Sequence, residues 1–386
     1  MPKVNKFSKL LLQLICIGAV SGLSACSMFS KKPKNLPSEL VVFTQTATVK
    51  TAWKNSVGKS GDYEFSPVAA GDSIVAASAD GTIVRLDAAT GQTKWKITAE
   101  SNLTAGVGVD VSANAIAVAG SKGALLVYDL DGKLRWTAQA SSDILAAPAV
   151  GDGVVVVRSV DNHIAAFELD TGKRRWVVER TLPLLTARTG AGLVINRDNV
   201  IVAVPGGKLV SMALINGGVR WESAVGESRG ATELERVVDT AGVPAVYGAD
   251  VCSGAYQGRV ACFDVNSGVQ RWSKTLSTAL ALGVDERFVF AADDRGTVNA
   301  FSRTYGQSEW RNDKLSYRGL SSPISFGRAV VIADASGYVH FLSREDGSFL
   351  ARTATDGSAI TASPVIVGSN VVFQTKAGEI VALAID

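Results

Sequence analysis

Few residues in this chain have the types and spacing that catalysis or metal binding requires. Its two histidines, His163 and His340, lie 177 positions apart. A histidine-rich zinc site is therefore excluded, and only these two histidines are available for a Ser-His-Asp triad. No glycine-rich phosphate-binding motif stands between a strand and a helix. We therefore expect no enzyme activity, no metal and no other cofactor.

The first cysteines belong to a targeting segment. Three lysines precede an apolar stretch over residues 10–20, which is too short to span a bilayer. Leu23-Ser24-Ala25 then precede Cys26, which resembles the lipobox of bacterial lipoproteins. We interpret residues 1–25 as a lipoprotein signal peptide, Cys26 as the lipidated mature N-terminus and residues 26–39 as a tether. The alternative is an ordinary cleavable signal followed by a chance cysteine.

The residue after Cys26 indicates the destination. Ser27 stands where an inner-membrane retention signal typically has Asp. The resemblance to lipoproteins thus implies the outer membrane, with the protein facing the periplasm.

Cys252 and Cys262 are the two cysteines of the mature chain other than Cys26. If residues 256–258 form a three-residue hairpin loop with Gly258 in the left-handed conformation, Cys252 lies directly opposite Cys262. Their side chains then approach closely, and an oxidising periplasm favours a disulfide. A two-residue loop would instead place the two cysteines on opposite faces of the hairpin.

The spacing of the tryptophans indicates the repeated structural unit that positions the other residues. Successive tryptophans are 42, 41, 40, 45, 51 and 38 residues apart, and six of the seven follow a glycine by four residues. Self-similarity at this period is typical of β-propellers, where large aromatic side chains fill the space between blades. We therefore assign a structural role to Trp53, Trp95, Trp136, Trp176, Trp221, Trp272 and Trp310.

One repeat, residues 66–98, contains four strand patterns over 66–70, 73–78, 82–86 and 93–98. Continuing the repeat predicts an all-β, eight-bladed propeller of four-stranded antiparallel blades over residues 40–386. The seventh blade has Ala351 at the tryptophan position, and the eighth has only three strands before the chain ends. We predict that the N-terminal strand around Trp53 supplies the missing one and closes the ring.

Composition agrees with this class and argues against a nucleic-acid surface. The chain has 38 glycines, 47% hydrophobic residues and 19% charged residues, with a net charge of +3. After residue 34, no Lys/Arg run interleaves with aromatic residues.

The two longest tryptophan intervals, 176–221 and 221–272, indicate a binding surface. Their extra residues fall at 179–190 and 226–243, each between the last strand of one blade and the first of the next. Both insertions are therefore expected on one face of the ring, with apolar leucines beside charged residues. The alternative is that these leucines pack beneath the loop as a small satellite core.

The Gly-x-x-x-Trp repeat resembles that of quinoprotein dehydrogenases, which are eight-bladed and bind pyrroloquinoline quinone with calcium. Those enzymes also have an adjacent cysteine pair, which this chain lacks. A quinone-binding or other ligand-binding propeller is therefore the alternative function.

The lipobox, the repeat and the two insertions together resemble the propeller lipoproteins of the outer-membrane β-barrel assembly machinery, a family with PQQ-like repeats. Members bind the periplasmic POTRA domains of BamA through a Leu-x-Leu-Arg loop and an acidic stretch after Gly-x-Thr-Glu. Residues 185–188 match the first motif except at Ala187, and residues 230–233 match the second. Asp239 falls on the first family aspartate, while Ala241 replaces the second.

The resemblance implies a non-catalytic scaffold that assists folding and insertion of outer-membrane proteins. It implies BamA as partner and unfolded outer-membrane proteins as a second one. The partner-binding residues it implies are Leu184, Leu185, Arg188, Glu233, Arg236 and Asp239.

Overall fold

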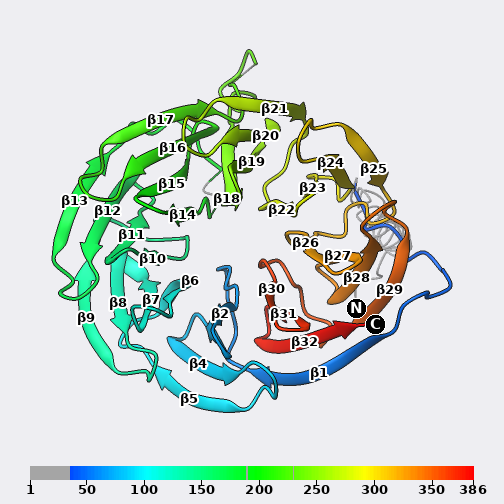
Figure 1. Cartoon of the computed structure of the whole chain (residues 1–386), viewed down its shortest axis with the longest axis horizontal. Helices are drawn as coiled ribbons and strands as arrows, with labels where there is room; N and C mark the ends of the chain where they lie inside the picture. Colours follow the sequence, from blue (N-terminus) through cyan, green and yellow to red (C-terminus); the bar gives the residue numbers. More distant parts are fainter. Residues whose placement is uncertain (1–34, 188–189, 229) are drawn as a thin grey trace, which may run out of the picture. The chain divides into compact units, whose positions relative to one another are not determined.

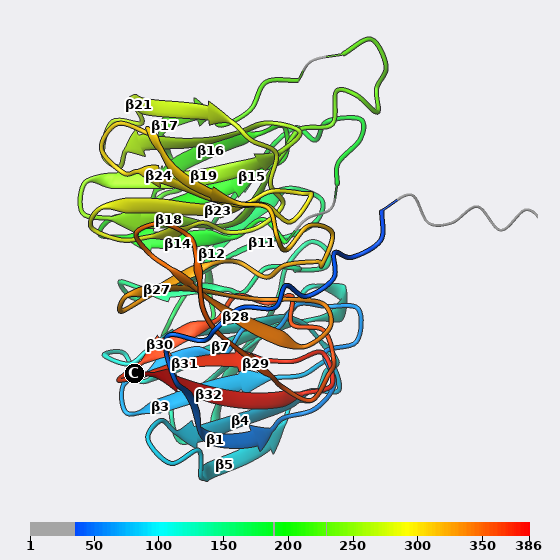
Figure 2. The same cartoon turned by 90° about the vertical axis from the view of Figure 1, so that its right-hand side faces the viewer.

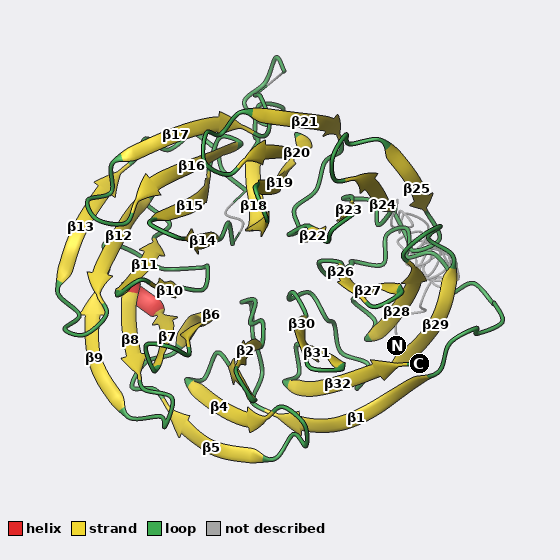
Figure 3. Ribbon diagram, viewed as in Figure 1, coloured by secondary structure: helices red, strands yellow, loops and turns green. Residues whose placement is uncertain are grey.

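The computed structural model describes residues 35–187, 190–228 and 230–386. Within residues 37–386, eight four-stranded antiparallel sheets are arranged as blades around an axis (Figure 1). Strands dominate the described chain, and one short 3-10 turn, η1 (Ser121–Gly123), interrupts them (Figure 3). The predicted eight-bladed propeller is confirmed.

The strands follow the chain in order, and the first strand of each blade lies nearest the axis (Figure 1). Blades 1 to 4 are β2 (Val68–Ala70), β3 (Ser73–Ala77), β4 (Thr82–Asp87), β5 (Thr93–Thr98); β6 (Leu103–Asp110), β7 (Ala115–Gly120), β8 (Ala124–Tyr128), β9 (Leu134–Gln139); β10 (Ala149–Gly151), β11 (Val154–Arg158), β12 (His163–Glu168), β13 (Arg174–Glu179); β14 (Leu193–Asn196), β15 (Asn199–Val204), β16 (Lys208–Ala213), β17 (Val219–Ala224). Blades 5 to 8 are β18 (Asp239–Tyr247), β19 (Asp250–Tyr256), β20 (Arg259–Asp264), β21 (Gln270–Thr275); β22 (Gly283–Val284), β23 (Phe288–Ala292), β24 (Val298–Ser302), β25 (Ser308–Asn312); β26 (Ile324–Phe326), β27 (Ala329–Ala333), β28 (Tyr338–Ser343), β29 (Phe349–Ala354); β30 (Val365–Val367), β31 (Asn370–Gln374), β32 (Glu379–Ile385), completed by β1 (Val49–Ser56).

The hydrophobic core is divided among the junctions between blades. The cluster around Trp136, for example, combines β7 and β8 of blade 2 with β11 and β12 of blade 3. Strand β3 is buried at every position because both of its faces meet a neighbouring blade, whereas the outer strand β5 has mostly exposed residues. Apolar burial on both faces of the middle strands thus holds adjacent blades together.

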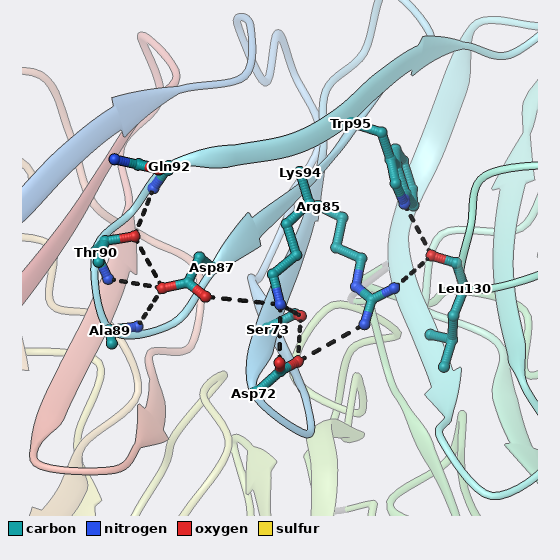
Figure 4. A network of polar contacts seen from close by, with 10 residues as sticks. All are labelled: Asp72, Ser73, Arg85, Asp87, Ala89, Thr90, Gln92, Lys94, Trp95 and Leu130. Carbon is teal, nitrogen blue, oxygen red and sulfur yellow. Dashed lines mark hydrogen bonds and ion pairs between the residues drawn. The ribbon is translucent and has the colours of Figure 1, made fainter.

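Each tryptophan docks on the next blade. The indole Nε1–H of Trp95 donates to the carbonyl of Leu130 at 2.8 Å, beside the Arg85 guanidinium, which donates to the same oxygen at 2.7 Å (Figure 4). A Cβ on Gly132 would lie 3.2 Å from the Trp95 ring. The other six indoles donate in the same way to Ala88, Leu169, Leu214, Val265, Arg303 and Arg344.

The turn that receives each indole requires glycine. In blade 1, the Asp87 carboxylate accepts the backbone N–H of Thr90 at 2.9 Å and the Thr90 hydroxyl at 2.8 Å (Figure 4). These hydrogen bonds from Thr90 lower the pKa of Asp87. Gly91 follows with φ +69°, and its Cβ would lie 2.5 Å from the Trp53 ring. The glycine of each receiving turn therefore provides both the left-handed backbone and the space for the preceding indole.

The ring closes as predicted, through antiparallel pairing of β1 with β32. Trp53 of β1 docks on blade 1, so the seven tryptophans serve seven of the eight junctions. At the remaining junction, between blades 7 and 8, Ala351 is fully buried. A tryptophan there would have no turn to dock on, because the two outer strands of blade 8, β32 and β1, come from opposite ends of the chain.

Cys252 of β19 pairs with Cys262 of β20, and a disulfide joins them with Cα atoms 4.1 Å apart. The register matches the three-residue loop, but the expected conformation of Gly258 is wrong. Gln257 has the positive φ, +51°, and the Gly258 N–H donates to the Ala255 carbonyl at 3.1 Å. Gly258 instead provides space, since a Cβ there would lie 2.7 Å from the Ala255 Cβ.

The signal peptide over residues 1–25, Cys26 and residues 27–34 of the tether lie outside the described residues. In the part of the chain that the structure describes, no helix has the length and apolar character needed to cross a bilayer.

Candidate partner-binding surface

Two connections between blades are longer than the others and stand on the same end of the ring. The first insertion, residues 180–192, joins β13 to β14, and the second, residues 225–238, joins β17 to β18. Both run from an outer strand to the next inner strand, and both project to the same side in Figure 2. We call this end of the ring the insertion face.

The second insertion is shorter than the sequence predicted. Residues 239–243 belong to β18, whose register with β19 shifts between Ala241 and Ala245. The extra residues there form a bulge in the inner strand.

The leucines of the first insertion are exposed. Leu184 is 86% exposed, while Leu185 and Leu182 are 47% and 40% exposed. The alternative that they form a satellite core beneath the loop is therefore wrong. Arg188, the other predicted contact of this insertion, lies outside the described residues.

The second insertion contains one hydrogen-bonded turn built from Thr232-Glu233-Leu234-Glu235. The Thr232 hydroxyl accepts the Glu235 N–H at 3.3 Å, and the Glu235 carboxylate accepts the Thr232 N–H at 3.1 Å. This reciprocal pair is a capping box, and hydrogen bonds from the Thr232 and Ala231 N–H groups lower the pKa of Glu235. The turn presents Leu234, which is 72% exposed.

Glu233 and Arg236, both predicted contacts, bond to each other in this turn. Their side chains form an ion pair at 3.2 Å, and Arg236 Nε donates to the Gly230 carbonyl at 3.0 Å. Both side chains are about half exposed, at 54% and 49%. They thus surround Leu234 with charge. Leu234 was not among the predicted contacts, although the T-x-x-E pattern indicates such a turn.

Asp239 is not on this surface, in contrast to its predicted role. It is 2% exposed, and its carboxylate accepts the N–H groups of Ala187 and, at 3.1 Å, Gly206. It therefore ties the first insertion to blade 4 from the start of β18. Burial lowers the pKa of nearby Arg158, and the negative charge of Asp239 opposes this effect.

An open groove of about 550 Å³ separates the first insertion from the β15–β16 hairpin. Leu182 and Pro183 line one side, and Pro205 and Lys208 line the other. Lys208 and Arg180 both pair with Glu222, Lys208 at 2.6 Å. The groove therefore combines apolar walls with a charged rim.

A second cavity, of about 590 Å³, lies among the inner strands and is lined mainly by apolar residues and glycine. Glu64 is the one ionisable residue among the described residues that line it. Burial raises the pKa of Glu64, opposed by the charge of Lys376. No group of three potential metal ligands occurs among the described residues. Pyrroloquinoline quinone carries three carboxylates and needs calcium, so this lining does not fit it.

The fold and these surfaces define an eight-bladed β-propeller with two exposed insertions on one face. A family profile described as "Outer membrane protein assembly factor BamB" matches residues 37–107 and 79–312. The chain belongs to this BamB family.

Relatives over nearly the full length support the assignment. The BamB proteins of Burkholderia pseudomallei and Bordetella pertussis are each 40% identical, over 97% and 95% of this chain and 98% and 95% of theirs. The crystal structure of BamB from Moraxella catarrhalis covers 87% of this chain and all of its own, with a TM-score of 0.80 and 25% identity.

Quinohemoprotein alcohol dehydrogenase from Comamonas testosteroni is also similar, covering 87% of this chain and 76% of its own. The TM-score is 0.67 and the identity 13%, so this likeness shows the shared fold alone.

Proposed function

We propose that this protein is a non-catalytic scaffold of the outer-membrane β-barrel assembly machinery, binding the periplasmic POTRA domains of BamA through its insertion face. The observation that carries the proposal is the pair of exposed leucines, Leu184 and Leu234, on neighbouring insertions of a BamB-family propeller. Exposed apolar side chains surrounded by charged groups are typical of protein interfaces. Arg188 belongs to the same proposed contact.

We also propose that residues 1–25 are removed and that a lipid on Cys26 holds the domain at the outer membrane, facing the periplasm, through the tether over residues 26–39. Asp239 acts indirectly in this account, because its carboxylate holds the Ala187 N–H and so positions the first insertion. Glu233 and Arg236 shape the second insertion around Leu234.

Co-purification of BamA from detergent extracts tests the binding face. Leu184→Asp and Leu234→Asp place a carboxylate in the apolar centre, and we expect each to reduce BamA retention. Ile215→Asp is the matched control, since Ile215 is 75% exposed in the β16–β17 turn at the opposite end of the ring. Equal retention by all three variants, or unchanged retention by Arg188→Glu, would show that the assigned face is wrong.

Unfolded outer-membrane proteins are a second proposed partner. The outermost strand of each blade pairs with only one other strand of its sheet, and an extended segment can add to such an edge. Crosslinking of an unfolded barrel strand to these edges supports the idea, and crosslinks confined to the insertion face contradict it.

A further inference from the structure

Residues 38–48, which we call the strap, lie along blade 7 before the chain enters β1. At one end, the Ser38 N–H donates to the Ser316 carbonyl at 2.9 Å, and Arg318 Nη1 donates to the Ser38 carbonyl at 2.9 Å. At the other end, the Thr46 N–H donates to the Leu350 carbonyl at 2.9 Å. The strap is therefore bound to the domain at both ends.

The middle of the strap is bound through an aromatic ring. Phe43 stacks on Phe349 of β29 with ring centroids 5.1 Å apart, and the Arg352 guanidinium lies 5.0 Å from the Phe43 centroid. Arg352 Nη1 also donates to the Val41 carbonyl at 3.1 Å. Val42, in contrast, is fully exposed, so one side of the strap packs on blade 7 and the other faces solvent.

The two arginines that hold the strap are themselves fixed from inside blade 7. Arg318 Nε pairs with the buried Asp334 carboxylate at 2.6 Å, and Asp334 also bonds His340 Nε2 at 3.0 Å. Arg352 Nε donates to His340 Nδ1 at 3.2 Å. Because these groups are tied to one another, the strap docks on a preformed site.

The direction of the strap decides where the N-terminal tether leaves the ring. Ser38 contacts the connection between β25 and β26, which runs from an outer to an inner strand and so stands on the insertion face. Val49, where β1 begins, pairs with Ile385 at the end of β32, on the opposite face. Figure 2 shows the strap, in blue, starting on the side to which the insertions project and crossing the ring before β1 returns.

We propose that the strap makes the lipid anchor leave from the insertion face, so that this face, at its blade 7 side, is turned toward the membrane surface. This inference rests on lipidation of Cys26 in the proposed function. Ser38 is 12 residues from Cys26, a contour of at most about 40 Å and a flexible end-to-end distance of about 20 Å. With the strap released, the tether would run 23 residues to Val49 and leave from the opposite face.

Energy transfer on vesicles tests this orientation. The purified lipidated full-length protein is bound to phosphatidylethanolamine–phosphatidylglycerol vesicles that carry an acceptor dye. A donor dye is placed at Leu234→Cys on the insertion face or at Ile215→Cys on the opposite face, two positions with similar exposure, 72% and 75%. We expect stronger transfer from position 234 than from position 215.

The strap variants complete the test. Replacing residues 38–44 by Gly and Ser frees the strap without touching blade 7, and Phe43→Ala is a milder second variant. Val42→Ala is the matched control. Hydrogen exchange of the Thr46 and Ala47 amides, which both donate to the Leu350 carbonyl in the docked strap, reports release. We expect release to abolish or reverse the difference in transfer between positions 234 and 215, and Val42→Ala to retain this difference.

Equal transfer from the two positions in the wild type overturns the inference, as does an unchanged difference after hydrogen exchange shows the strap released. These outcomes leave the proposed function intact, because the protein still binds the vesicles. Failure of the protein to bind vesicles, with no lipid on Cys26 by mass spectrometry, overturns the proposed anchor and this inference together.

Discussion

Seven indoles and their glycine partners hold most blade junctions. Each indole fills the junction and donates one hydrogen bond to a turn carbonyl of the next blade, as Trp136 does to Leu169 at 2.7 Å. The receiving glycine has a positive φ, so its conformation and its missing side chain are both needed. Substitution of such a glycine should therefore lower the free energy of unfolding more than substitution of a glycine that is needed for its conformation alone.

Blade 3 contains a matched pair of glycines for this comparison. Gly172 has φ +68° and a Cβ there would lie 2.6 Å from the Trp136 ring, whereas Gly153 has φ +73° and nothing within 4 Å. We expect Gly153→Ala to lower the free energy of unfolding by about 1 kcal/mol and Gly172→Ala to lower it by a further 1–3 kcal/mol, roughly. Equal values in urea denaturation would contradict this docking account.

His340 makes stability depend on pH. Burial lowers the pKa of His340; Asp334 opposes this effect, while Arg352 and Arg318 reinforce it. The unfolded chain thus takes up a proton near pH 6.5 while the folded chain does not, so stability should fall as pH decreases below that value. Burial alone would raise the pKa of Asp334, but hydrogen bonds from His340, Tyr338 and Arg318 lower it. The stability that ionised Asp334 contributes is therefore lost only at more acidic pH.

Urea denaturation between about pH 7 and about pH 5 measures this effect. We expect a smaller loss of stability in His340→Gln than in the wild type over this range. The same pH dependence in both proteins would assign the titration to another group.

At this scale the sequence predicted the repeated residues well and the singular ones poorly. The regular spacing of the seven tryptophans, six of them in the Gly-x-x-x-Trp pattern, identified the docking residues. Asp239 does not belong to the repeated pattern, and its burial depends on contacts with Ala187 and Gly206, which are distant in sequence. The left-handed residue of the β19–β20 turn is Gln257 because Gly258 is needed for close packing, which local turn preferences do not include.

Among the elements, β1 has the largest single role, since its pairing with β32 joins the two ends of the chain without a covalent bond. Deleting residues 40–56 removes this strand with Trp53 and most of the strap, and exposes the edge of β32. We expect the cooperative unfolding transition to disappear in circular dichroism and calorimetry. A single sharp transition in the deletion variant would refute closure by β1.

The β19–β20 hairpin carries the disulfide, and digestion tests it directly. Trypsin cleaves after Arg259, between Cys252 and Cys262. We expect one linked peptide pair in the non-reduced digest, separated by reduction, and a loss of about 2–3 kcal/mol of stability in the reduced protein. Free thiols in the native protein would falsify the bridge.

Strand order and blade count were predictable because each blade repeats the same alternation of strands and turns. The insertions were located for the converse reason, as departures from the period. Their internal structure was only partly predictable: the capping box is visible in Thr232-Glu233-Leu234-Glu235, but the exposure of Leu234 follows from how the turn stands on the ring. Ala351 was explained only once the unconnected outer strands of blade 8 were seen.

At the scale of the whole molecule, the blades and the insertion face have different roles. Its blades provide a rigid support, and the insertion face combines Leu184 and Leu234 with the Ser38 end of the strap. Under the function and the inference proposed above, the anchor leaves the ring at the same end as the proposed binding residues, which favours binding of a membrane-embedded partner.

Photocrosslinking in intact cells tests the central claim most directly. A photoreactive amino acid is placed at position 184 on the insertion face or at position 215 on the opposite face, both exposed. We predict a crosslink to the POTRA region of BamA from position 184 and none from position 215. A BamA crosslink from position 215 with none from position 184 would contradict the account.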